Sequence, residues 1–218
     1  DVLITSLRIA FVTTVICVLL GYPVAYLISR MNANKGALFV LLITAPTWIN
    51  MLVRTYAWIG ILSDNGLINI ILGFLGLPTV KLLHTEGAVI LGMVYNFIPF
   101  MILQIYTSLS KMDKSLLQAA SDLGADAVQS FLRVTLPLSI PGVVSGITLV
   151  FLPTVSSFFI PKLLGGGDYV LIGNLIENYF VSTGDWNFGS AISLIMAVII
   201  MVSMYLTKKI DKDVEGQK

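Results

Sequence analysis

The chain has 218 residues, of which 56% are apolar and only 11% are charged, and its mean hydropathy is +0.91. An average soluble domain carries about 25% charged residues, so this composition excludes an ordinary soluble fold and calls for lipid around much of the surface. The net charge of +1 argues against a nucleic-acid binder, which would present a basic face. The single cysteine, Cys17, excludes a disulfide within the chain.

Five apolar segments are long enough to cross a membrane as helices, which takes about 20 mostly apolar residues. They are too long and too evenly apolar for the alternating strands of a membrane barrel. We therefore predict an all-α integral membrane protein, a polytopic helical bundle in which residues 1–218 form a single transmembrane domain. Since the first segment follows closely on Asp1, we expect the natural N-terminus to lie further upstream. The five segments are Ile9–Ile28, Ala37–Leu62, Gly87–Ser110, the stretch between Arg133 and Lys162, and Trp186–Thr207.

A further apolar stretch, from Gly66 to Val80, is too short to span the membrane. Gly76 and Pro78 favour the end of a helix, because glycine adopts the left-handed conformation readily and proline donates no backbone hydrogen bond. We predict a short helix over about residues 65–77 that lies at the membrane surface, with a re-entrant segment as the alternative.

The distribution of lysine and arginine predicts the orientation, because cytoplasmic loops are enriched in both. Basic residues follow the first, third and fifth segments, whereas the other two loops contain only Lys81 and Lys162 beside several carboxylates. We therefore predict that these three regions, the last of which is the C-terminus, are cytoplasmic, and that the helix at 65–77 is extracellular. The basic residues of the cytoplasmic group are Arg30, Lys35, Lys111, Lys114, Arg133, Lys208, Lys209, Lys212 and Lys218.

The cytoplasmic loop over residues 111–137, between the third and fourth segments, is longer and more structured than a simple connector. Asp113 can cap a first helix, Gly124 ends it, and Asp126 can cap a second helix. Pro137 is expected to end or kink the second helix before the fourth span. The loop is thus predicted to be helix, glycine turn, helix, held at the membrane surface.

This loop resembles a motif shared by the permeases of ATP-binding-cassette importers, which reads Glu-Ala-Ala, three residues, Gly, nine residues, an aliphatic residue, one spacer and Leu-Pro. Gln118 replaces the acidic first residue, so that an ion pair at this position would become a neutral hydrogen bond. The resemblance implies a permease of the type I importer kind, whose coupling loop, here Gln118 to Pro137, docks on a separate ATPase. At the family's spacing the chain has Gln118-Ala119-Ala120, Gly124, Val134 and Leu136-Pro137. The docking residues implied are Gln118, Ala119, Ala120, Asp122, Leu123, Gly124, Ala125, Phe131 and Pro137.

Longer stretches resemble one branch of this family, the B-type permeases of spermidine/putrescine importers. These stretches include GYPVAYLISR, PTWINMLVRTYAW and PKLLGGGDYVLIGNLIENYF. That branch has six spans and lies in the bacterial inner membrane, which implies one further helix before the five found here. The resemblance also implies polyamine import with a second, similar permease chain, a dimer of the ATPase that binds ATP and magnesium, and an extracellular or periplasmic polyamine-binding protein.

The chemistry of the spans supports a polyamine only in part, because a polycation should meet acidic or aromatic groups. No Asp or Glu lies deep in a span, and the charge found there is the cation Arg54. We expect selection to rest with the binding protein, and the permease to offer a path that binds weakly enough for rapid release. Candidate path or gate residues are Asn50, Arg54, Tyr95, Asn96, Ser156 and Ser157. The alternative for Arg54 is an anchor at the membrane interface. The alternative for the others is hydrogen bonding between helices. Candidate outer-rim residues are Glu86, Asp185 and Trp186.

Other classes of protein fit the sequence less well. No P-loop G-x-x-x-x-G-K-[ST], paired-carboxylate or Ser-His-Asp pattern is present, so we expect no catalysis and no cofactor bound by this chain. His84 has no second ligand type nearby, which argues against a metal site. An ion-driven secondary transporter would need an ionisable relay within the membrane, whereas a permease for another small solute would keep the same mechanism. The alternative for the loop is a surface helix that only joins two spans.

Overall fold

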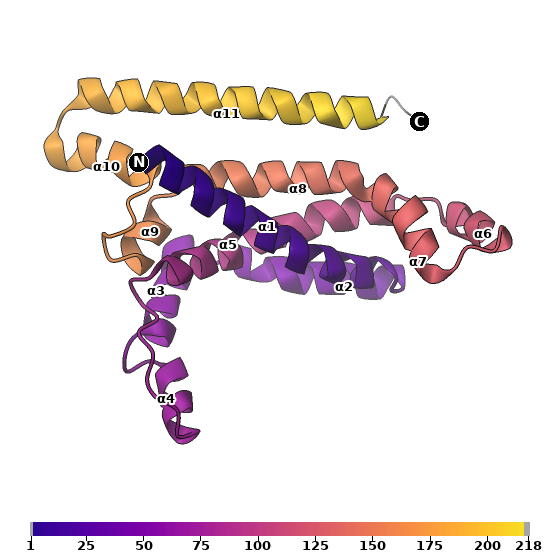
Figure 1. The fold of residues 1–218 in the computed structure, drawn as a ribbon, viewed down its shortest axis with the longest axis horizontal. Helices are drawn as coiled ribbons and strands as arrows, with labels where there is room; N and C mark the ends of the chain where they lie inside the picture. The colour runs from indigo at the N-terminus through magenta and orange to yellow at the C-terminus, as the bar shows by residue number, and fades with distance from the viewer. Residues whose placement is uncertain (1, 216–218) are drawn as a thin grey trace.

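The computed structural model describes residues 2–215, and helices make up most of this part of the chain (Figure 1). The predicted all-α fold class is confirmed. By length and composition, four helical stretches can cross a membrane, and a shorter apolar one covers Trp186–Val202. The four stretches are Val2–Ser29, Met51–Phe74, Glu86–Ser110 and Ala127–Ser156. Of the basic residues behind the predicted orientation, Lys218 and the side chains of Lys114, Lys208, Lys209 and Lys212 lie outside the described residues.

The helices follow one another with short connections. In chain order they are α1 (Val2–Ser29), α2 (Ala33–Thr44), α3 (Met51–Leu62), α4 (Leu67–Phe74), α5 (Glu86–Ser110), α6 (Lys114–Asp122), α7 (Ala127–Ser130), α8 (Leu136–Ser156), α9 (Phe159–Leu164), α10 (Ile172–Glu177) and α11 (Trp186–Glu215). A 3-10 turn, Ala45–Trp48, precedes α3, and π-helical turns occupy Phe131–Thr135 before α8 and Asn178–Thr183 after α10.

The long helices α1, α5 and α8 form the bundle, and α5 is its central member (Figure 1). In its most apolar window 56% of the residues are buried, against 33% in the corresponding window of α1 and 28% in that of Ala127–Ser156, which includes α8. The core side chains of α5, such as Met93, Met101 and Ile105, are fully enclosed. The outer faces of α1 and α8 therefore remain for lipid or partner chains.

Glycines let α1 and α8 approach α5 closely, as small residues do between membrane helices. A Cβ added at Gly21 of α1 would lie 3.1 Å from Cγ of Met101. On α8, a Cβ at Gly142 would lie 2.8 Å from the backbone oxygen of Gln104, and one at Gly146 would meet the flexible end of Met101. The contact at Gly142 is the least forgiving, because backbone cannot move aside.

The predicted second span, Ala37–Leu62, is not one helix. The chain leaves the α-helix at the 3-10 turn that contains Pro46, whose ring removes a backbone donor. Two extended residues follow, and the Asn50 side chain then accepts a hydrogen bond from the backbone N–H of Leu52 at 2.8 Å, which caps α3. The expectation of a continuous helix is therefore wrong, because a proline and a capping residue interrupt the apolar run.

The helices α3 and α4 run away from the bundle, across its long direction, at the end opposite α6 (Figure 1). The helix predicted over about residues 65–77 is present as the shorter α4, Leu67–Phe74. Gly76, with a φ of +71°, follows the helix as predicted. The Asn69 side chain bonds both the N–H and the carbonyl of Val80, at 2.9 and 3.0 Å, and closes the loop that follows.

We predict that Gly142→Ala destabilises the chain by about 1–3 kcal/mol, because the added methyl group overpacks the α5–α8 contact. Gly60→Ala, within α3, is the matched control, since a Cβ there meets nothing within 4 Å and alanine favours the helix by about 1 kcal/mol. Thermal unfolding of the purified chain in detergent measures both. Equal melting temperatures for the two variants would contradict the close approach of α8 to α5.

Candidate functional site

The first helix of the predicted coupling loop, α6, has both of the ends that the sequence predicted. The Asp113 carboxylate accepts a hydrogen bond from the backbone N–H of Ser115 at 2.9 Å and caps the helix. This backbone hydrogen bond, with help from the Ser115 hydroxyl, holds the pKa of the Asp113 carboxyl below its ordinary value. At the other end, Gly124 has a φ of +80°, which favours glycine. Its N–H donates to the Ser121 carbonyl at 2.9 Å.

The second helix of the loop also starts as predicted and is kinked before the fourth span. Asp126 caps α7 by accepting a hydrogen bond from the N–H of Gln129 at 2.7 Å. The chain then continues through a π-helical turn into α8, and Pro137 lies in the first turn of α8. The predicted kink before the fourth span is present, because α7 bends away from α8 at this π-helical turn (Figure 1). Pro137 has no N–H to donate to the turn before it, and prolines and π-helical turns are both common causes of a helix kink.

Phe131 attaches the loop to α1. Its ring meets the rings of Tyr22 and Tyr26 edge-on, with centroids 5.9 and 5.3 Å apart. The Tyr22 hydroxyl and the Ser139 hydroxyl of α8 are 2.8 Å apart and share a hydrogen bond. Aromatic pairs of this geometry add about 0.5–1.5 kcal/mol beyond their buried area. The loop is thus joined to α1 by ring packing and to α8 by continuous helix.

The α6 segment projects from one end of the bundle (Figure 1), and some of the apolar side chains in and next to it are exposed. Leu123 is 88% exposed, and Leu116 is also exposed. Of the predicted docking residues, Gln118, Ala119, Asp122, Leu123, Gly124 and Pro137 are exposed, whereas Ala120, Ala125 and Phe131 are partly buried. Exposed apolar side chains gathered on a projecting helix are typical of a surface that meets another protein. Val128 and Leu132 extend this surface, although the sequence did not single them out for docking.

A cavity of about 550 Å³, lined by polar and apolar residues, lies between α6 and the adjoining parts of α5 and α8. Gln104, Thr107 and Ser108 of α5 line it, together with Ser145 of α8 and Lys111. None of the residues that line it was predicted as a docking or path residue. The spacing of the three α5 residues, which places them on one helix face, is the signal that indicates it, because polar groups in a span avoid lipid.

Two of the candidate path residues come together. The Arg54 guanidinium carbon lies 5.9 Å from the centroid of the Tyr95 ring, and Tyr95 meets Trp58 edge-on with centroids 5.3 Å apart. The Nε and Nη1 atoms of Arg54 are buried and have no hydrogen-bond partner. The side chain as a whole is partly buried, so the guanidinium loses part of its hydration without gaining hydrogen bonds at these two atoms. Arg54 is therefore held at a cost in stability, as an interaction with a group outside this chain or a gate would require.

The remaining path candidates lie apart from this pair. Asn96 is 2% exposed and donates to the Gly92 carbonyl at 2.8 Å, while its Oδ1 is buried without a partner. Asn50 is exposed and caps α3. Ser156 and Ser157 mark the end of α8, and no described hydrogen bond or ring contact joins them to Arg54 or Tyr95.

The outer-rim candidates already have partners within the chain. Glu86 accepts an ion-paired hydrogen bond from Arg8 at 2.8 Å. Asp185 accepts from the backbone N–H of Phe188 at 3.1 Å near the start of α11. Trp186 is 67% exposed and meets Phe180 edge-on. Glu86 and Asp185 therefore stabilise the fold, and their attraction for an external cation is reduced accordingly.

A lipid-embedded helical bundle with a structured loop projecting from one end defines the membrane subunit of a transporter with several components. Residues 7–216 match the family of binding-protein-dependent transport system inner membrane components, and the chain belongs to that family. It is accordingly a multi-pass inner-membrane transport protein rather than an enzyme.

Two curated relatives show which members of this family the chain resembles. The spermidine/putrescine transport system permease protein PotB of Haemophilus influenzae is 41% identical over 217 aligned positions, covering 96% of this chain and 76% of the relative. The protein of the same name in Escherichia coli K12 is 38% identical over 221 positions, covering 99% of this chain and 80% of the relative. The resemblance found in the sequence, to importer permeases and to this branch, is confirmed.

A solved structure supports the fold. The bacterial alginate ABC transporter, solved in complex with its alginate pentasaccharide-bound periplasmic protein, contains a chain that superposes with a TM-score of 0.78. The superposition covers 98% of this chain and 80% of that one at 16% identity. At this identity the likeness speaks for the fold alone, and it confirms the type I importer permease architecture.

We predict that Arg54→Met raises the free energy of unfolding by about 1–3 kcal/mol, because it removes two buried nitrogen atoms that have no hydrogen-bond partner and puts an apolar side chain in their place. Arg8→Met is the control. It removes an arginine that is exposed and paired, which should cost about 0–1 kcal/mol. Thermal unfolding of the isolated chain in detergent compares the two. A loss of stability in Arg54→Met would show that this guanidinium is satisfied within the chain.

Proposed function

We propose that this chain is one permease subunit of an ATP-driven polyamine importer, and that it forms half of the path with a second, similar permease chain. In this proposal the loop from Gln118 to Pro137 docks on a separate ATPase dimer, which binds ATP and magnesium. The single observation behind the docking role is the α6 segment, which projects from the bundle with Leu123 almost fully exposed.

The α6 segment has the shape and chemistry for insertion into a groove of another protein. Leu123 and Leu116 provide apolar contact, and the small side chains of Ala119 and Ala120 permit close approach. Gln118, which is exposed, offers an amide in place of the family's carboxylate, so its contact with the ATPase is a neutral hydrogen bond.

The attachments of the loop provide a route for force. Closure of the ATPase dimer would displace α6, and the Gly124 turn would pass the displacement to α7. From there the continuous helix leads into α8, while the Phe131 ring pushes on Tyr22 and Tyr26 of α1. Because α1 and α8 both pack on α5, movement of the loop would tilt the bundle as a unit.

The docking role requires α6 to lie in the cytoplasm, as the distribution of basic residues predicts. The cavity next to α6 and the C-terminus would then also face the cytoplasm. The opposite end of the bundle, with α9, α10 and the Arg8–Glu86 pair, would face the periplasm and the polyamine-binding protein (Figure 1).

The polyamine cargo rests on the relatives, which are named as spermidine/putrescine permeases and match nearly all of this chain. The spans offer little to hold a polycation, and Arg54 would repel one. Selection would accordingly belong to the binding protein, while the permease offers a path of low affinity.

Reconstitution of the chain in liposomes with its companion permease, ATPase and binding protein tests the proposal. We expect ATP hydrolysis to rise when the binding protein carries spermidine or putrescine, and labelled spermidine to accumulate on the side of the liposome opposite to the binding protein. Hydrolysis that responds to a different solute would overturn the polyamine cargo, and no response of hydrolysis to any loaded binding protein would overturn the importer itself.

We predict that Gly124→Leu uncouples ATP hydrolysis from uptake, because the φ of +80° costs a non-glycine residue about 1–2 kcal/mol and displaces the turn. Gly124→Asn should retain more coupling, since asparagine tolerates this conformation. Gly167→Leu imposes the same strain in the loop after α9, where φ is +93° and a Cβ also meets nothing within 4 Å. The ratio of spermidine transported to ATP hydrolysed should fall in Gly124→Leu alone, and an unchanged ratio in that variant would argue against docking.

A further inference from the structure

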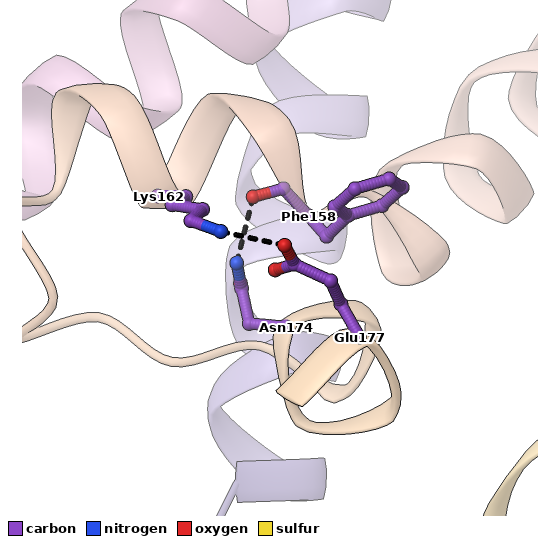
Figure 2. A network of polar contacts seen from close by, with 4 residues as sticks. All are labelled: Phe158, Lys162, Asn174 and Glu177. Carbon is purple, nitrogen blue, oxygen red and sulfur yellow. Dashed lines mark hydrogen bonds and ion pairs between the residues drawn. The ribbon is translucent and has the colours of Figure 1, made fainter. Parts of the chain in front are cut away.

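A cluster of polar contacts joins α9 to α10 at the end of the bundle opposite α6 (Figures 1 and 2). The Lys162 ammonium donates to a Glu177 carboxylate oxygen at 2.5 Å. The Asn174 side-chain amide donates to the Phe158 carbonyl at 2.7 Å. Lys162 lies one turn after Phe158 in α9, and Glu177 lies nearly one turn after Asn174 in α10, so the two contacts run side by side.

The contact made by Asn174 is sufficient to hold the two helices together. The Phe158 carbonyl also accepts the backbone N–H of Lys162 at 3.1 Å, which uses both of its lone pairs. The Asn174 Oδ1 in turn accepts the N–H of Leu171 at 3.1 Å, so the amide is fixed at both ends. The ion pair is therefore an additional contact, and its loss leaves the α9–α10 connection in place.

The two members of the ion pair differ in their access to water. The Lys162 side chain is 56% exposed on a flexible stem, whereas the Glu177 side chain is only 22% exposed. A partly enclosed carboxylate is thus covered by an ammonium group that can swing away into solvent. Departure of Lys162 would leave Glu177 without its compensating cation, and such a group attracts another cation of the same kind.

We propose that Glu177 is a binding residue for a cargo ammonium group, and that Lys162 is a tethered ammonium that occupies the site until the cargo displaces it. This inference rests on the proposed polyamine cargo. Because a primary ammonium of the cargo is chemically equivalent to the lysine ammonium, exchange replaces one charge-assisted hydrogen bond with another, and the carboxylate is never left bare. Binding remains weak, as a path requires, since each incoming ammonium competes with Lys162.

The neighbouring residues suit a polyamine in a second respect. The Phe158 and Phe159 rings pack on each other at the start of α9, with centroids 4.1 Å apart. Aromatic rings attract cations and also pack against the methylene groups between the ammonium groups of a polyamine. A carboxylate on α10 and two rings at the start of α9 are both groups that a polycation favours.

The other outer ion pair lacks these properties. Glu86 is paired with Arg8, whose planar guanidinium differs from an ammonium in shape and hydrogen bonding. A cargo ammonium is therefore a closer chemical match to Lys162 than to Arg8. Of the two outer pairs, Lys162–Glu177 is therefore the one suited to exchange with a polyamine.

Binding of labelled spermidine to the detergent-purified complex of all importer subunits except the binding protein tests the proposal by equilibrium dialysis. We expect Lys162→Met to bind spermidine about tenfold more tightly, because the internal competitor is gone, and Glu177→Gln to bind about tenfold more weakly, because a charge-assisted hydrogen bond is lost. A purely structural ion pair predicts the opposite for Lys162, since both variants would then weaken or leave unchanged the binding of spermidine.

Two controls keep the outcome clear. Lys81→Met removes another exposed lysine, in the loop before α5, so a general effect of net charge would change its affinity as well. Spermidine-loaded binding protein must also stimulate ATP hydrolysis in the unaltered complex. If it does and Lys162→Met binds spermidine no more tightly, the exchange is overturned and the importer stands. If it does not stimulate hydrolysis, the polyamine cargo itself is overturned.

Discussion

The close packing of α8 against α5 determines where the other parts of the chain lie. Gly142 and Gly146 bring the two helices together, and Gly21 does the same between α1 and α5. In lipid there is no hydrophobic force to drive helices together, so van der Waals contact of this kind holds the bundle. Because the coupling loop continues directly into α8 and rests on α1, its position follows from this packing.

The two ends of the bundle are built for different tasks. At one end α6 is short, capped at both ends and exposed, and Phe131 and a π-helical turn connect it rigidly to the long helices. A rigid connection transmits displacement, which a flexible loop would absorb. At the other end α9 and α10 are short helices joined by polar side-chain contacts, and the proposed exchange of ammonium groups takes place there. In the proposed importer, the ATPase would thus act on the α6 end of the bundle, and the cargo would enter at the α9–α10 end.

Buried polar groups without partners mark the places where the chain alone is incomplete. The guanidinium of Arg54 and the Oδ1 atom of Asn96 lie in the part of the bundle that also includes Tyr95. Native proteins satisfy nearly all such groups, so partners from a second chain, from water or from another conformation are expected there. If this chain forms half of a path, as proposed, the second permease chain is one source of partners for these groups.

The local elements were determined by the sequence itself, because short-range chemistry decides them. Asp113, Gly124 and Asp126 predict the caps and turn of the coupling loop, since each acts on backbone groups within a few residues. The apolar runs predict helices in lipid for the same kind of reason, as backbone groups there have no other partner. The motif spacing and the resemblance to importer permeases were likewise readable from the chain.

Only the tertiary structure decided how distant residues combine. Lys162 and Glu177 meet because α9 folds back onto α10, and Phe131 meets Tyr22 because α7 reaches α1. The end of the α-helix at Pro46 and the π-helical turn before Pro137 also depend on the tertiary structure, since a proline can end, kink or begin a helix. Which of these occurs depends on whether neighbouring turns and helices satisfy the backbone groups that the proline leaves free. The residues next to the proline in the sequence do not determine this.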